Sequence, residues 1–115
     1  MSLVYKVCSK DEWKEAVRIG FFSGSAVDVR DGFIHLSTKE QVKVTVLKHF
    51  SGQKNLQIIQ FKVDKLKTKL KWEISRDNDL FPHYYGHIET NLADKVFNLD
   101  LGSNGVHEFP KNFFS

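Results

Sequence analysis

The sequence predicts a single domain of the α+β class, and three observations support this prediction. The chain has 115 residues, of which 41% are hydrophobic and 13% aromatic, which suffices for one compact core but not for two ordinary domains. Helical periodicity occurs in the first half of the chain, whereas most segments rich in β-branched and aromatic residues lie in the second half. The resulting order, strand-helix-strand-helix and then three strands, favours an α+β or mixed α/β domain over a doubly wound parallel sheet.

Two helices are predicted in the N-terminal half, each marked by a capping sequence. Leu3–Cys8 is predicted to be the first strand, and Ser9 with Glu12 forms a capping box that starts a helix, which Gly20 ends. Phe21–Asp31 is predicted to be a loop because it contains glycine and an Arg-Asp-Gly turn.

A histidine lies in the second predicted strand, Gly32–Ser37. Either Ser37 or Thr38, each followed three residues later by Glu or Gln, then starts the second helix. Since side chains alternate along a strand, Phe33, His35 and Ser37 share one face. A helix start beyond them offers free N–H groups to a carboxylate or phosphate. The pattern indicates either a ligand site at His35 or a half-buried histidine beside a simple helix cap.

The C-terminal half is predicted to consist of strands and loops. A polar run within residues 75–81 marks one loop, and Leu80–Ile88 is predicted to be irregular because Pro82 and Gly86 oppose regular structure. β-branched and aromatic residues, or alternation, predict strands at Asn55–Val63, Leu70–Ile74 and Lys95–Leu101.

Composition argues against a disulfide-bonded, secreted or membrane-spanning protein. The single cysteine, Cys8, excludes an internal disulfide and a multi-cysteine metal site, and the N-terminus does not resemble a signal peptide. No apolar run approaches the roughly 18 residues that span a bilayer. We therefore expect a protein of the reducing cytoplasm with no membrane partner.

Charge gives only a weak indication of partners. The 17 basic residues are offset by 14 acidic ones, for a net charge of +3, which argues against a nucleic-acid partner. A lysine stripe, Lys65, Lys67, Lys69 and Lys71, recurs with period two within residues 62–71. It predicts a solvated strand face or a protected edge, with a phosphate-binding or nucleic-acid-binding stripe as the alternative.

The aromatic segment Phe81-Pro-His-Tyr-Tyr-Gly86 carries two polar ring tips, those of His83 and Tyr85. Such a segment suits recognition of a ring or a sugar, and the alternative is an aromatic plug that closes the core. His83 and His87 have the spacing of two helical metal ligands, but Pro82 and Gly86 oppose a helix there, so no metal site is predicted.

A carboxylate follows a tryptophan in the strand Leu70–Ile74. Burial of Glu73 against the indole of Trp72 would raise the pKa of Glu73 and make it an acid or a base. The alternative is a glutamate that faces solvent opposite a buried tryptophan.

Several short motifs occur together in one order along the chain, and this combination resembles the mostly bacterial domain-of-unknown-function family 952 from about Leu3 to Pro110. The motifs are Tyr5-Lys6, Gly24-Ser-Ala-Val-Asp28, Asp31-Gly-Phe-Ile-His-Leu-Ser-Thr38 with Gln41, His49-Phe50, Gly52-Gln53, Leu70-Lys-Trp-Glu73, Ser75-Arg76 and Phe81-Pro-His-Tyr-Tyr-Gly86.

The resemblance implies an ADP-ribosyltransferase-like fold, in which a split mixed sheet grips NAD. It implies that His35 and Tyr85 orient a ribose and that Glu73 acts on the glycosidic bond, so these three are the expected catalytic residues. The expected ligand-binding residues hold phosphates or border the ligand, and they are Lys6, Ser37, Thr38, Trp72, Arg76, Phe81, His83 and Gly86.

The function that the resemblance implies is binding of NAD, ADP-ribose or a related nucleotide, with glycosyl transfer or hydrolysis. The alternative is a non-catalytic ligand-sensing or protein-binding module of the same fold.

Overall fold

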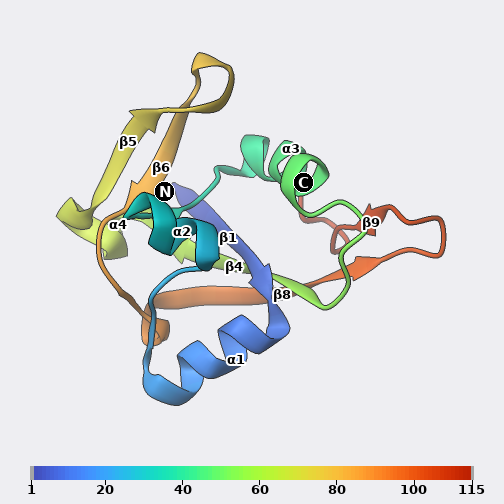
Figure 1. Ribbon diagram of the computed structural model, residues 1–115, viewed down its shortest axis with the longest axis horizontal. Helices are drawn as coiled ribbons and strands as arrows, with labels where there is room; N and C mark the ends of the chain where they lie inside the picture. The colour runs from blue at the N-terminus through green and yellow to red at the C-terminus, as the bar shows by residue number, and fades with distance from the viewer. Residues whose placement is uncertain (1, 115) are drawn as a thin grey trace.

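The computed structural model describes residues 2–114, in which helices and strands follow one another along the chain (Figure 1). The strands are β1 (Leu3–Ser9), β2 (Phe21–Phe22), β3 (Ile34–His35), β4 (Leu56–Lys62), β5 (Leu70–Ile74), β6 (Leu80–Tyr84), β7 (Ile88–Glu89), β8 (Ala93–Leu101) and β9 (His107–Glu108). The helices are α1 (Lys10–Ile19), α2 (Ala26–Asp31), α3 (Lys39–His49) and α4 (Val63–Leu66), with short 3-10 turns at Lys67–Lys69, Arg76–Asn78 and Thr90–Leu92.

The strands form several antiparallel sheets. The first has the order β1-β4-β8-β9, the second β3-β6-β5, and β2 pairs with β7. Backbone hydrogen bonds between Tyr5 and Ser37, of 2.8 and 2.9 Å, join the first two sheets. The α+β class is therefore confirmed, but the mixed sheet is wrong, since every pairing among the described strands is antiparallel. The tight connection between β5 and β6 permits only antiparallel pairing.

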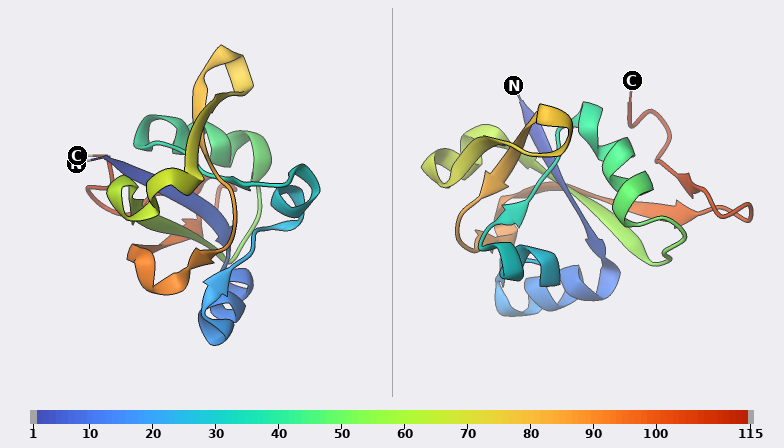
Figure 2. Two further views of the ribbon diagram at one scale, coloured as in Figure 1. Left: turned by 90° about the vertical axis from the view of Figure 1, so that its left-hand side faces the viewer. Right: turned by 45° about the horizontal axis from the view of Figure 1, so that its top comes forward.

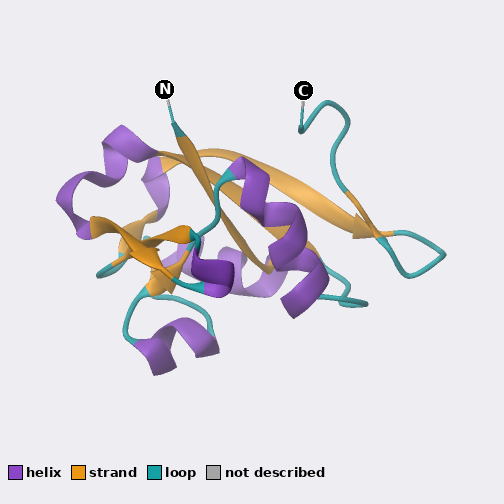
Figure 3. Cartoon of the chain, turned by 90° about the horizontal axis from the view of Figure 1, so that it is seen from above, coloured by secondary structure: helices purple, strands orange, loops and turns teal. Residues whose placement is uncertain are grey.

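The core occupies both faces of the first sheet. Alternation along β1 directs Val4 and Cys8 to one face, where Trp13 of α1 packs, and Tyr5 to the other, where Val42 of α3 packs. Figure 1 shows α3 and α1 on opposite sides of these strands, and Figure 3 shows α3 lying across them.

Burial raises the pKa of Cys8 to about 12, so this thiol stays protonated at neutral pH. Within residues 2–114, no helix has both the length and the apolar character needed to cross a membrane.

Most of the predicted elements are confirmed. The capping box of Ser9 and Glu12 is present at the start of α1. At the start of α3, the residue that caps the helix is Thr38, which exchanges hydrogen bonds with Gln41. The β4, β5 and β8 strands coincide with predicted strands to within two residues at each end.

The loop predicted at Phe21–Asp31 is wrong, because this segment contains β2 and α2. The backbone N–H of Ser25 donates to Asp28 Oδ2 at 2.8 Å, and Gly32 ends the helix in a left-handed conformation. The helices that precede β4 are therefore three, and not two.

The irregular segment predicted at Leu80–Ile88 is also wrong over its first half, which forms β6. The carbonyl of Pro82 accepts a hydrogen bond from the N–H of Leu36 at 3.0 Å. The N–H and C=O of one residue in an antiparallel strand point to the same side. An N–H on Pro82 would therefore point toward Leu36 and not toward β5. Proline is therefore compatible with the full ladder between β5 and β6, a hairpin that projects from the rest of the molecule (Figure 2).

The lysine stripe does not form a strand face. Only its last residue, Lys71, lies in a strand, while Lys65 lies in α4 and the other two lie in the 3-10 turn that follows. Lys67 has a φ of 57°, which reverses the chain direction before β5 and breaks the period-two pattern.

Gly24 closely approaches Asp28 at the start of α2. Its φ is +113°, and a Cβ there would lie 2.7 Å from Asp28 Cβ. We expect Gly24→Ala to lower the free energy of unfolding by more than about 1 kcal/mol. Gly105→Ala is the control, because Gly105 also has a positive φ but open space around it. Urea unfolding of both variants measures the difference, and equal losses would contradict the close approach.

Candidate functional site

One face of the second sheet gathers most of the predicted site residues. On β6, the side chains of Phe81, His83 and Tyr85 follow with period two, and the last lies just beyond the strand. The pairing register sets His35 of β3 and Lys71 of β5 directly opposite His83. Directly opposed residues share a face, so histidine, histidine and lysine form a row across the three strands.

Glu73 is the centre of one polar cluster on this face. Its Oε1 lies 2.8 Å from His83 Nδ1 and accepts a hydrogen bond of 2.8 Å from the Tyr85 hydroxyl. The bond with His83, and then that with Tyr85, lower the pKa of Glu73. The expectation that Trp72 raises this pKa is wrong, because neighbouring residues on a strand point to opposite faces and the Trp72 side chain is itself 43% exposed.

The contact with Glu73 also changes the titration of Tyr85. The hydrogen bond to Glu73 raises the pKa of the Tyr85 phenol above its ordinary value. We expect Glu73→Gln to return this pKa toward the ordinary range, because an uncharged amide stabilises the phenol less. The tyrosinate absorbance, followed against pH in wild type and variant, measures this change, and Lys65→Ala serves as control. Identical titration curves for wild type and Glu73→Gln would contradict the contact.

Asp28 is the centre of a second, buried cluster. This side chain is 1% exposed, and its Oδ1 lies 2.7 Å from His35 Nδ1 and accepts the His35 backbone N–H at 3.0 Å. Its Oδ2 lies 2.7 Å from Lys6 Nζ. Burial acts to raise the pKa of Asp28, but the hydrogen bonds from His35 and the charge of Lys6 outweigh it and lower the pKa to about 2.

Lys6 therefore holds His35 in place, directly and through Asp28. Its buried ammonium also donates to the His35 carbonyl at 3.2 Å, so both the ring and the backbone of this histidine are held. A phosphate contact at Lys6 stays a prediction, and it would require the ammonium to leave the Asp28 carboxylate.

Phe33 connects the two clusters. Its ring stacks on His83 at 4.1 Å between centroids and lies 4.6 Å from His35 and 5.4 Å from Tyr85. The two imidazoles meet edge to face at 5.5 Å. Four rings thus form one packed platform.

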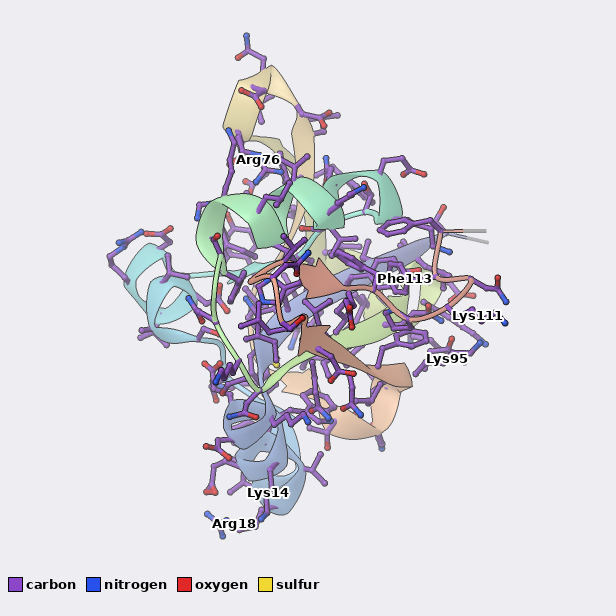
Figure 4. The ribbon with its side chains drawn as sticks, turned by 90° about the vertical axis from the view of Figure 1, so that its right-hand side faces the viewer. Lys14, Arg18, Arg76, Lys95, Lys111 and Phe113 are labelled. Carbon is purple, nitrogen blue, oxygen red and sulfur yellow. The ribbon has the colours of Figure 1, made fainter. Side chains whose placement is uncertain are left out.

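Arg76 lies at the other end of this face, beside α3 (Figure 4). Its guanidinium stacks over Phe81 at 4.7 Å and donates to Thr45 Oγ1 at 3.3 Å, which in turn lies 2.9 Å from Ser37 Oγ. Burial, and then the charge of Arg76, lower the pKa of His49 at the end of α3. This end of the face therefore carries the Arg76 guanidinium together with the acidic side chains of Asp77 and Asp79.

A hollow of about 130 Å³ lies at the Arg76 end. Its lining includes Arg76 and Phe81 together with the acidic Glu40, Asp77 and Asp79, but neither His35 nor Glu73. It is therefore an extension of the face at one end, and the clusters around Asp28 and Glu73 lie outside it.

The remaining predicted residues have other positions. Thr38 caps α3, and Trp72 lies on the opposite face of β5. Gly86 has a φ of +128° just after β6, where the Lys69 side chain approaches. His83 and His87 do not share partners, since the ring of His87 lies 5.0 Å from that of Phe21. Among the described residues no group of three or more metal-ligating side chains occurs.

Sequence reasoning did not single out five residues as part of this site. Asp28 and His49 belong to motifs of the resemblance, but without the fold neither shows a partner. Alternation along the strand places Phe33 on one face with His35, but nothing in the sequence marks Phe33 as a site residue. Asp31 belongs to the same motif as His35 and contacts it four residues along the chain, whereas Thr45 contacts Arg76 only through tertiary structure.

Comparisons with known proteins place the chain in a family. The family model described as "Protein of unknown function (DUF952)" matches residues 7–96. The crystal structure of protein CC0527 from Caulobacter crescentus is 40% identical, with a TM-score of 0.93, over 99% of this chain and 100% of that chain. The solution NMR structure of CC0527 is 44% identical, with a TM-score of 0.82, over 92% and 91% of the two chains. A search of curated proteins finds no significant match. The chain belongs to the DUF952 family.

Proposed function

We propose that the protein binds a nucleotide-like ligand of the NAD or ADP-ribose class on the face formed by β3, β6 and β5. The observation that carries this proposal is the position of Glu73. Two donors, His83 and Tyr85, hold its Oε1, while Oε2 has no hydrogen-bond partner among the described residues and the side chain is 40% exposed. A carboxylate fixed in this way is ionised at neutral pH and faces solvent beside a platform of rings.

The face offers complementary groups to each part of such a ligand. The outer side of the ring platform around Phe33 suits a planar base or nicotinamide. His35 and Tyr85 suit ribose hydroxyls, because both carry hydrogen-bonding tips at the edge of the platform. The guanidinium of Arg76 suits a phosphate at the other end of the face.

Glu73 would act on the glycosidic bond by electrostatics. As the bond to nicotinamide breaks, the ribose gains oxocarbenium character, and a nearby carboxylate stabilises that positive charge. The lowered pKa of Glu73 favours this role over that of a general acid. An acceptor, either water or a hydroxyl or amine of another molecule, then completes hydrolysis or transfer.

The proposal is tested by thermal unfolding in the presence of NAD, ADP-ribose and nicotinamide. A ligand that binds only the folded state stabilises it by about 2.7 kcal/mol at about 100 times its Kd, so we expect a concentration-dependent rise of Tm for NAD or ADP-ribose. His35→Ala and Phe33→Leu should lose the rise, and His107→Asn, on the distant β9, should keep it.

Nicotinamide release from NAD, followed in the same samples, separates the two functional alternatives. Loss of release in Glu73→Gln with binding retained supports catalysis, whereas binding without any release in wild type supports a ligand-sensing module. The absence of any Tm change in wild type would contradict the proposed ligand class.

A further inference from the structure

In the proposed glycosidic chemistry His35 contacts the ribose and His83 holds Glu73, but the row that these two histidines form with Lys71 also suits a second chemistry. The three residues lie at one register across β3, β6 and β5. Each imidazole has its Nδ1 beside a carboxylate, Asp28 at 2.7 Å and Glu73 at 2.8 Å. A carboxylate at Nδ1 fixes that nitrogen as the N–H donor, so proton exchange with a ligand takes place at Nε2.

His83 is arranged as a base. Its ring is buried, yet Nε2 has no hydrogen-bond partner among the described residues. This nitrogen is not sealed from solvent, because the only buried side-chain polar atom without a partner in residues 2–114 is the Tyr5 hydroxyl oxygen. With Nδ1–H donated to Glu73, the neutral ring carries its lone pair at Nε2.

His35 is arranged as an acid. Its Nδ1 faces Asp28, and its Nε2 lies 3.1 Å from Asp31 Oδ2. Only the protonated ring can donate to both carboxylates, whereas the neutral ring donates to one. Asp31 is partly exposed and also pairs with Arg30, so a ligand oxygen can replace it at Nε2 and receive the proton.

Lys71 completes the row with an unpaired positive charge. It is exposed, and no ion pair joins it to any residue within 2–114. The register places this residue opposite His83, on the same face as the two imidazoles. Two imidazoles with complementary proton positions and one cation are the groups needed to displace an oxygen at a phosphate.

We propose that this row hydrolyses ribonucleoside 2′,3′-cyclic phosphates. His83 Nε2 removes a proton from water, and the water oxygen forms a bond to phosphorus. The bond from phosphorus to one ribose oxygen breaks, and that oxygen takes the proton from His35 Nε2. Lys71 neutralises the non-bridging oxygens, and the product is a ribonucleoside monophosphate with one free hydroxyl. Proton exchange with solvent returns both histidines to their starting forms.

The test follows conversion of 2′,3′-cyclic AMP to the monophosphate by phosphorus NMR, with proteins purified identically. General acid and base catalysis each contribute about 10²–10⁴-fold, so we expect His83→Asn and His35→Asn to lose at least about 100-fold in kcat/KM. Lys71→Ala should mainly raise KM. The matched controls, His107→Asn and Lys65→Ala, should retain wild-type rates.

The pH profile tests the roles without relying on folding of the variants. Wild-type kcat/KM should be bell-shaped, and each histidine variant that keeps residual activity should lose one limb. The inference is overturned if wild type does not hydrolyse the cyclic phosphate, or if His83→Asn retains the wild-type rate. It does not depend on NAD binding, so a protein that binds NAD without this hydrolysis contradicts only this inference.

Discussion

Replacing Asp28 with alanine is expected to lower the free energy of unfolding by about 3–5 kcal/mol, because it leaves a buried ammonium without its partner. Lys6 Nζ lies 2.7 Å from the Asp28 carboxylate, and both side chains are buried. The same change removes the acceptor for the backbone N–H groups of Ser25 and His35. Urea unfolding of wild type and Asp28→Ala measures the loss.

Asp31→Ala is the matched control for this prediction. Asp31 contacts the same histidine and also pairs with Arg30, but its side chain is 31% exposed. Surface ion pairs contribute about 0–1 kcal/mol, so we expect a small loss. Equal destabilisation by the two replacements would show that the Lys6–Asp28 pair does not hold the structure as described.

Acid should weaken the fold through the same carboxylate. The pKa of Asp28 falls from 3.8 to about 2 on folding, so the folded state binds the proton less tightly than the unfolded chain. Its contribution of about 2 kcal/mol is fully present above pH 4 and is lost as pH falls toward 2.

The pH dependence of urea unfolding in wild type and Asp28→Asn isolates this contribution. Other carboxylates with lowered pKa values, Glu73 among them, affect both proteins alike, so the difference between the two curves reports Asp28. We expect the difference to shrink by about 2 kcal/mol between pH 4 and pH 2. A constant difference across this range would contradict the charged state of Asp28.

The fold could be predicted where local signals and tertiary structure agree. The capping box at Ser9 and the alternation in β8 are such cases. α2 has six residues, and the only one that is buried is the polar Asp28, so its sequence carries no apolar period to detect. β6 was obscured by Pro82, whose effect depends on which side of the strand its partner lies. The lysines of the stripe recur with the period of a strand, but their backbone is not extended throughout, because Lys67 with its positive φ turns the chain.

The candidate site was only partly predictable for a similar reason. His35, Glu73 and Tyr85 could be named because each is a chemically capable residue at a recognisable position. Their pairing could not, since the hydrogen bonds of Glu73 with His83 and Tyr85 require the β5–β6 hairpin. The role of Asp28 depends on the packing of α2 against Lys6 of β1, over a separation of 22 residues that no local pattern reports.

Histidine NMR during titration with ADP-ribose reports whether the face around His35 and His83 binds a nucleotide-like ligand. We expect the ring resonances of His35 and His83 to move together and saturate, while those of His107 on β9 stay in place. Saturable binding that leaves both His35 and His83 unchanged, or no spectral change at all, would contradict binding of such a ligand at this face.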